Sequence, residues 1–171
     1  MQYLKYFGIL LLFLAAGFYG VIWMAPSEVS FQVNEDIHAP ITEVFDATTN
    51  PHKLSKWITG VNTVKQVKGD LASKGSEYDL YFEGEGNMIM RQTVNVFEAN
   101  KLYAYKGVVE DFMEVISSTE YEALDSNSTR IFTTVSIRPL SQKMKMFMYA
   151  KETHKKNSAA NYTRLKEYLE E

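Results

Sequence analysis

The residues with the most potential for acid–base or metal chemistry are dispersed along the chain. The three histidines are His38, His52 and His154, and no two of them have the His-x3-His spacing of a zinc site. The chain has no cysteine, which excludes disulfides, thiolate metal ligands and cysteine nucleophiles. We therefore expect neither a metal centre nor a cofactor.

Carboxylates are frequent, but their spacing directs them towards solvent. Glu114, Glu120 and Glu122 alternate with apolar and small residues, as on the exposed face of a half-buried strand. Acid–base catalysis by paired carboxylates requires one of them to lie in an apolar pocket. The chain also lacks the G-x-S-x-G motif, a phosphate-binding loop and a dinucleotide-binding fingerprint. No catalytic residue is predicted.

A second set of polar residues shares the apolar face of predicted strands. Ser117, Thr119 and Tyr121 have the same parity as the apolar Val115. Such groups can orient a ligand inside an apolar pocket, or they can bond to one another in a closed core, and both alternatives stay open. The side chains predicted to line a cavity are Trp57, Tyr78, Leu80, Met88, Met90, Gln92, Tyr105, Val115, Ser117, Thr119, Tyr121, Thr133, Met144, Phe147 and Met148.

Hydrophobic periodicity and turn signals predict the elements that position these residues. Pro40 and Asn50-Pro51 delimit two short helices, and helical spacing predicts one long helix over Ser141–Tyr168 with Ser141 as its N-cap. A turn is expected at Gly84-Glu85-Gly86. The predicted strands span residues 29–37, 61–68, 77–83, 87–99, 102–109, 113–124 and 129–138.

This order of elements predicts an α+β fold. Consecutive strands joined by tight turns pair as an antiparallel meander. A sheet with one apolar face needs a cover, and only the C-terminal helix is long enough to supply it. We therefore expect a curved antiparallel sheet of about seven strands wrapped around a long C-terminal helix, with two short helices between the first two strands.

The segment that joins the first two predicted strands resembles the opening of SRPBCC proteins. Its motifs are Ile37-His38-Ala39-Pro40, Val44-Phe45-Asp46, Asn50-Pro51 and Leu54–Trp57. This superfamily includes START-like, polyketide-cyclase and birch-pollen-allergen-like helix-grip proteins. The resemblance implies that residues 28–171 form a ligand-binding domain with a cavity for apolar or amphipathic ligands. It implies no common catalytic residue.

Residues 1–27 are predicted to form a transmembrane anchor ahead of this domain. The run Tyr6–Ser27 contains no charged residue, and as a helix it would span about 33 Å, enough to cross a bilayer core. Lys5 precedes the run and Glu28 follows it, which favours a single-pass protein with an extracytoplasmic domain. A cleaved signal peptide that ends near Ala15-Ala16-Gly17 is the alternative.

Composition and charge limit the classes of molecule that the chain is expected to bind. A formal charge of −3 argues against nucleic acid, which requires clustered positive charge. We expect a membrane-tethered module that binds a lipid or other hydrophobic small molecule. The alternatives are a cyclase- or hydratase-type enzyme, in which Tyr105, Tyr121 and Gln92 polarise a carbonyl, and a partner-binding protein with a filled core. The lysines expected on the solvated face of the terminal helix, with anionic lipid as the other possibility, are Lys143, Lys145, Lys151, Lys155 and Lys156.

Overall fold

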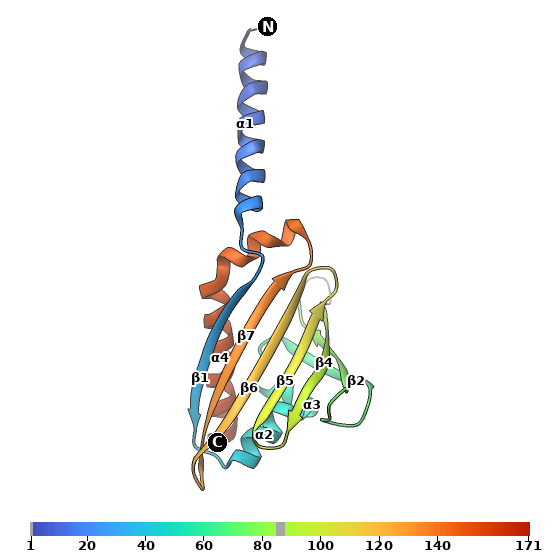
Figure 1. Cartoon of the computed structure of the whole chain (residues 1–171), viewed down its shortest axis with the longest axis vertical. Coiled ribbons are helices and arrows are strands. Elements are labelled where there is room, and N and C mark those ends of the chain that lie inside the picture. Colours follow the sequence, from blue (N-terminus) through green and yellow to red (C-terminus); the bar gives the residue numbers. More distant parts are fainter. Residues whose placement is uncertain (1, 85–87) are drawn as a thin grey trace.

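One antiparallel sheet organises the domain in the computed structural model of the chain, which describes residues 2–84 and 88–171. Its strands are β1 (Val29–Ile37), β2 (Val61–Lys68), β3 (Glu77–Phe82), β4 (Ile89–Glu98), β5 (Leu102–Val109), β6 (Met113–Asp125) and β7 (Ser128–Pro139). Strands β2 to β7 pair in sequence order, and the last strand, β7, also pairs with the first strand, β1. Figure 1 shows the sheet curving from the long strands β1, β7 and β6 towards the shorter β2 and β3 at its other edge.

Two short helices fill the connection between β1 and β2, and local sequence explains both. Helix α2 (Ile41–Thr49) follows Pro40, whose φ of −58° is already suited to a helix start. Helix α3 (Pro51–Trp57) begins after Asn50, whose side-chain oxygen accepts a hydrogen bond of 3.1 Å from the His52 N–H. The extended backbone of Asn50 separates the two helices, as expected for a residue that precedes proline.

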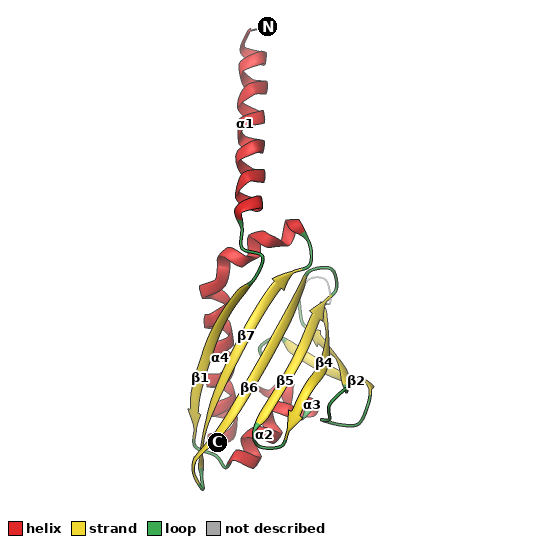
Figure 2. Cartoon of the chain, viewed as in Figure 1, coloured by secondary structure: helices red, strands yellow, loops and turns green. Residues whose placement is uncertain are grey.

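The C-terminal helix α4 (Lys151–Glu170) lies along the inner face of the sheet, beside β1 and β7 (Figure 2). Its C-terminal half is tied to the end of β1. The Glu170 carboxylate accepts a 2.8 Å hydrogen bond from the His38 N–H, and the Lys166 ammonium donates to the Asp36 carbonyl at 2.8 Å. The sheet that wraps a terminal helix, with two short helices after β1, confirms the predicted fold class.

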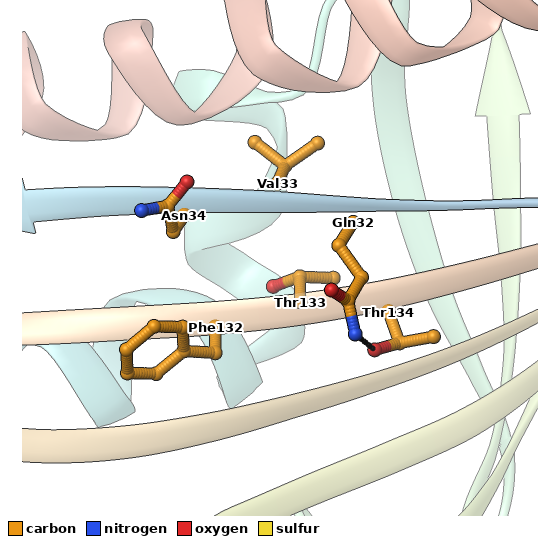
Figure 3. A pocket seen from close by; sticks show the side chains of 6 residues that line it. All are labelled: Gln32, Val33, Asn34, Phe132, Thr133 and Thr134. Carbon is orange, nitrogen blue, oxygen red and sulfur yellow. Dashed lines mark hydrogen bonds between the residues drawn. The ribbon is translucent and has the colours of Figure 1, made fainter.

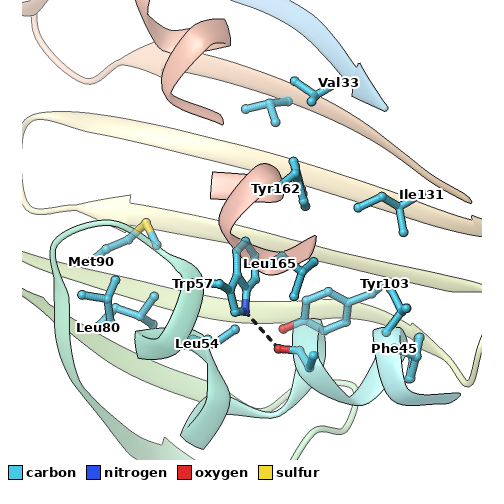
Figure 4. Packing of buried hydrophobic residues seen from close by; sticks show 14 of the residues in the cluster. Val33, Phe45, Leu54, Trp57, Leu80, Met90, Tyr103, Ile131, Tyr162 and Leu165 are labelled. Carbon is cyan, nitrogen blue, oxygen red and sulfur yellow. Dashed lines mark hydrogen bonds between the residues drawn. The ribbon is translucent and has the colours of Figure 1, made fainter. Parts of the chain in front are cut away.

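Alternating side chains of the sheet build the core. On β1 the side chains at 29, 31 and 33 are buried, whereas those at 30, 32 and 34 are exposed. Leu165 of α4 is completely buried against this face. Figure 4 shows how the core extends across the sheet and helices through Val33, Phe45, Leu54, Trp57, Leu80, Met90, Tyr103, Ile131, Tyr162 and Leu165.

The prediction of one continuous helix over Ser141–Tyr168 is wrong at its start. A 3₁₀ helix, η1 (Gln142–Ala150), precedes α4. Met144 and Phe147 are three residues apart, a spacing that places side chains on one face of either helix type, so the sequence pattern does not separate the two. Ser141 stands before η1 but its side chain makes no capping bond. The turn predicted at Gly84-Glu85-Gly86 lies largely outside the described residues.

The N-terminal helix α1 (Gln2–Met24) projects from the domain (Figure 1). Its stretch Tyr6–Met24 is long and apolar enough to cross a membrane, and almost none of that stretch is buried in the domain. A signal sequence near an N-terminus has the same length and composition. The helix therefore has an apolar surface that the rest of the chain does not cover.

Replacement of Leu165 by alanine should destabilise the domain, because it opens a cavity where α4 meets the sheet. We expect Leu165→Ala to lower the free energy of unfolding by about 2–5 kcal/mol. The matched control is Leu124→Ala, since Leu124 is exposed near the end of β6, and its effect should stay within about 0.5 kcal/mol. Urea unfolding followed by circular dichroism measures both, and equal effects would contradict this role of Leu165.

Candidate ligand-binding site

A small internal pocket lies between the inner face of the sheet and the helices α2, α3 and α4. Its volume is about 30 Å³. Its lining combines aromatic and aliphatic surface with hydroxyl groups and one amide. The lining residues are Thr48, Leu54, Trp57, Ile58, Gln92, Tyr103, Tyr105, Thr119, Tyr121 and Tyr162.

Strand register brings these side chains together. Tyr105 is paired with Ser117 and Tyr103 with Thr119 across β5 and β6, and Thr119 is in turn paired with Thr133 on β7. Residues paired across adjacent strands project from the same face of the sheet. The parity that buries the apolar residues therefore also directs this row of hydroxyl groups towards α4.

Hydrogen bonds between side chains join the sheet to two helices inside the pocket. The hydroxyls of Tyr121 and Thr48, on β6 and α2, are 2.7 Å apart. Thr133 donates to the Tyr162 hydroxyl of α4 at 2.8 Å, and its oxygen is also 2.9 Å from that of Thr119. Partnered hydroxyls of this kind can be buried at little cost.

Two further hydrogen bonds and one ring contact hold other lining residues of the pocket in place. The Gln92 amide donates to the Tyr103 hydroxyl at 2.7 Å, which leaves the proton of Tyr103 free to be donated elsewhere. The Trp57 indole N–H donates to the Ala47 carbonyl at 3.0 Å, and its ring stacks on Tyr162 with centroids 5.7 Å apart. Trp57 therefore connects α3 to both α2 and α4.

Burial controls the protonation of the pocket. Burial raises the pKa of Tyr105 to about 12 and also raises the pKa values of Tyr103, Tyr121 and Tyr162. These phenols are neutral at physiological pH, so they can donate hydrogen bonds to a carbonyl or hydroxyl. None of the ten lining residues is a carboxylate, histidine or lysine. The lining therefore offers hydrogen-bond donors without a group that exchanges protons near neutral pH.

The pocket is too small for a lipid in the described conformation. A volume of about 30 Å³ is close to that of one water molecule in the liquid, whereas sites for drug-sized ligands occupy roughly 300–1,000 Å³. A larger ligand must displace one of the surrounding elements. The conformation is therefore closed.

The structure brings part of the predicted lining set together and separates the rest. Trp57, Gln92, Tyr105, Thr119 and Tyr121 line the pocket. The other predicted residues lie beside it or away from it. Two of them, Ser117 and Thr133, are buried next to the pocket. The packed core contains Tyr78, Leu80, Met90 and Met148, and Val115 is half-buried against it. A hollow near η1 is lined by Met88 and Met144, and the exposed Phe147 packs on Phe112.

Some lining residues were not among those predicted, namely Thr48, Leu54, Ile58, Tyr103 and Tyr162. Tyr103 has the same strand parity as Tyr105, so the alternation itself contains the signal for it. Thr48 and Tyr162 lie on the apolar stripes of α2 and α4, and helical spacing identifies both stripes. Leu54 and Ile58 are four residues apart, so helical spacing predicts both on the same side of the second short helix as Trp57.

Surface hollows of the described residues exceed the internal pocket in volume, and two of them lie beside η1 and across β1 and β7. One of about 330 Å³ lies between η1 and the β5–β6 turn, and is lined by Met88, Val109, Glu110, Asp111, Phe112, Ser141 and Met144. The other, about 250 Å³, crosses β1 and β7 (Figure 3). There the Gln32 amide donates to the Thr134 hydroxyl at 3.3 Å, and Phe132 forms the apolar side. Its six lining residues include no titratable group.

Because of the buried phenols, the free energy of unfolding of the domain depends on pH in the alkaline range. An unfolded tyrosine loses its proton near pH 10, while native Tyr105 holds its proton until about pH 12. In this window the unfolded state binds fewer protons, so the contribution of Tyr105 to the free energy of unfolding falls as pH rises above about 10 and is constant below it. Urea unfolding at a series of pH values should show this slope. Tyr105→Phe should reduce the slope, while Phe97→Leu, which removes a core ring without a proton, should lower stability and leave the slope unchanged.

The fold has many solved counterparts. An aromatase/cyclase from a Streptomyces species superimposes with a TM-score of 0.68 at 12% identity, over 84% of this chain and 94% of that one. A major latex-like protein from Panax ginseng gives a TM-score of 0.66 at 11% identity, over 84% and 99% of the two chains. A hypothetical protein from Helicobacter pylori gives 0.65 at 17% identity, over 83% and 87%. A search of curated protein sequences finds no match.

A sequence profile defines the family. The profile described as polyketide cyclase / dehydrase and lipid transport matches residues 28–170. Together with the structural neighbours, the match supports a hydrophobic ligand-binding fold. Because the matched region covers most of the chain and carries the helix-grip architecture, the protein belongs to the polyketide cyclase / dehydrase and lipid transport family of the SRPBCC superfamily.

Proposed function

We propose that the protein is a membrane-tethered module that binds a hydrophobic small molecule or lipid between the sheet and α4. The observation that carries the proposal is the lining of the internal pocket, where aromatic rings surround neutral hydroxyl donors. Such a lining suits an apolar molecule with a carbonyl or hydroxyl group. Tyr103, which accepts from Gln92 and keeps its own proton, is the donor best placed to bind that oxygen.

The ligand needs a route into the closed pocket, and the two halves of α4 differ in how firmly they are held. The C-terminal half contains Tyr162 and Leu165, which are buried, and Asn161, whose oxygen accepts from the Thr59 N–H at 3.0 Å. None of the side chains from Lys151 to Ala160 is fully buried. Displacement of this first half exposes no fully buried side chain of its own, whereas displacement of η1 would expose the buried Met148, so the first half of α4 is the proposed moving element.

The membrane tether is proposed from the apolar surface of α1 and from two hydrogen bonds between the domain and the last turn of α1. Gln142 and Tyr149 of η1 bond to the carbonyls of Ile22 and Val21. Cleavage near Ala16 would leave a short apolar stub against η1 and remove most of the apolar surface that a bilayer would cover. The lysine before the helix and the glutamate after it favour an extracytoplasmic domain.

A cyclase- or hydratase-type reaction is the second candidate. Gln92, Tyr105 and Tyr121 converge on one pocket, and their groups could polarise a substrate carbonyl. Binding alone requires no proton transfer, and the lining provides no base for it near neutral pH. A turnover that survives simultaneous Gln92→Leu, Tyr105→Phe and Tyr121→Phe replacement would eliminate this assignment of catalytic groups.

Removal of the Tyr103 hydroxyl should weaken binding of an acyl ligand. The probe is an NBD-labelled fatty acid, titrated against the full chain in detergent micelles and followed by fluorescence. Loss of one hydrogen bond should raise Kd by about 2- to 10-fold in Tyr103→Phe. Tyr81→Phe, which removes a hydroxyl from β3 outside the pocket, should leave Kd unchanged. Absence of binding to fatty acid, sterol and monoglyceride probes, with no co-purified molecule in native mass spectrometry, would overturn the proposal.

The tether predicts an uncleaved chain in the membrane fraction. Expressed in its natural host, the protein should resist extraction by alkaline carbonate, because a membrane-spanning helix is removed only by detergent. Intact-mass analysis should find α1 still attached. A mature N-terminus at or near Gly17 in a soluble fraction would show that the segment is a signal peptide.

A further inference from the structure

We propose that η1, together with Leu140 before it, forms an interfacial surface that lies on an anionic lipid bilayer beside the end of α1. The proposal rests on the membrane tether proposed above and goes beyond it. It assigns a second membrane contact, made by a segment about 120 residues later in the chain than α1. This contact would fix the orientation of the domain on the membrane.

Two hydrogen bonds set the position of η1 relative to α1. The Tyr149 hydroxyl donates to the Val21 carbonyl at 3.0 Å, and the Gln142 amide donates to the Ile22 carbonyl at 3.4 Å. Carbonyls in the last turn of a helix lack partners within the helix, and a missing partner is costly near the bilayer core. The buried Ile22 and Ala25 add an apolar contact at the same place. η1 therefore lies at the depth of the final turn of α1.

Figure 1 shows η1 running across the end of α1 rather than continuing its direction. If α1 crosses the bilayer, a segment oriented in this way runs along the membrane surface. The side chains that would meet the membrane there are exposed in the structure. Met146 and Tyr149 are 42% and 56% exposed, and Leu140 is also exposed, whereas Phe147 packs on Phe112 of the β5–β6 turn. Trp23 at the end of α1 is 79% exposed, and tryptophan and tyrosine favour the membrane interface.

The charges of this surface fit an anionic bilayer. The stretch from Leu140 to Lys151 carries Lys143, Lys145 and Lys151 and contains no acidic residue. Apolar and aromatic side chains interspersed with lysines are the composition of interfacial segments that bind anionic lipid. The acidic side chains at this end of the sheet lie on neighbouring segments. Among the described residues they include Glu28, which pairs with Arg138 at 2.9 Å, Glu114, which pairs with Lys106 at 3.4 Å, Glu110 and Asp111 of the β5–β6 turn, and Glu152 of α4.

The interfacial placement has a consequence for ligand access. Ser141 and Met144 line the hollow of about 330 Å³ between η1 and the β5–β6 turn. A bilayer against η1 places this hollow next to lipid. The part of α4 that follows η1 is also the part with no fully buried side chain. The second membrane contact and the proposed opening motion therefore involve the same end of the domain.

Depth measurements on the full chain in lipid nanodiscs test the proposal. The chain has no cysteine, so single cysteines can carry an NBD label without other changes. Met146→Cys reports on η1, and Leu12→Cys reports on the middle of α1. Asn127→Cys in the β6–β7 turn is the control, because the length of β7 places it about 36 Å from η1. Quenching by doxyl-labelled phosphatidylcholine is measured in discs that contain phosphatidylglycerol.

The expected result is strong quenching at positions 12 and 146, several-fold above that at position 127. Quenching at 12 with no more at 146 than at 127 would overturn the interfacial surface and leave the tether intact. Absence of quenching at 12 would overturn the tether, and the interfacial surface with it. The variant Lys143→Gln, Lys145→Gln, Lys151→Gln should lower quenching at 146 in anionic discs and not at 12. Unchanged quenching at 146 in this variant would overturn the assignment to an anionic bilayer.

Discussion

The hydroxyl chain from α4 to the sheet is the interaction on which the closed domain depends. Tyr162 receives a hydrogen bond from Thr133, whose oxygen lies next to that of Thr119, while Tyr121 bonds to Thr48 of α2. Each of these groups is buried, and a buried hydroxyl without a partner costs about 1–3 kcal/mol. The described residues contain no buried side-chain nitrogen or oxygen atom that lacks a partner. The helices can therefore cover this polar row only in the register that satisfies it.

The same hydrogen bonds determine what a ligand must provide. A molecule that enters between α4 and the sheet separates donors from acceptors, so a purely aliphatic molecule would leave hydroxyls unpaired. A carbonyl or hydroxyl oxygen on the ligand restores one of these bonds, and the free proton of Tyr103 is positioned for it. Selectivity for an amphipathic ligand over a hydrocarbon then follows from desolvation of the pocket rather than from a charged recognition group. In the proposed function, a lining without charged groups discriminates between ligands in this way.

The sequence predicts the fold more completely than the lining of the pocket, because the fold follows from local signals and the pocket depends on contacts between distant residues. Strand parity, Pro40 and the Asn50-Pro51 break are local signals, and they were sufficient for the sheet and the short helices. The size of the pocket depends on how Trp57 and Tyr162 stack, and that contact joins residues about 100 positions apart. Sequence spacing does not predict the 3₁₀ form of η1 either, because η1 packs against α1 and β7, which are distant in the sequence or outside its own pattern. Tyr103 is different, because the strand alternation that predicts Tyr105 as a lining residue applies equally to Tyr103.

One end of the sheet holds α4 in place, and the other end is the proposed site of ligand entry. At the far end, Lys166 ties α4 to the backbone of β1 and Glu170 ties it to His38 just after β1, and these bonds involve backbone groups that no ligand needs to reach. At the end beside α1, the covering elements are η1 and the weakly buried first half of α4. A domain that opened at its far end would break the bonds that hold the helix in register. One that opens beside α1 loses little buried surface, and a bilayer against η1 would cover the apolar side chains that remain exposed there. The proposed tether and the proposed ligand route are thus compatible, because both use the end of the sheet at which the first half of α4 has no fully buried side chain.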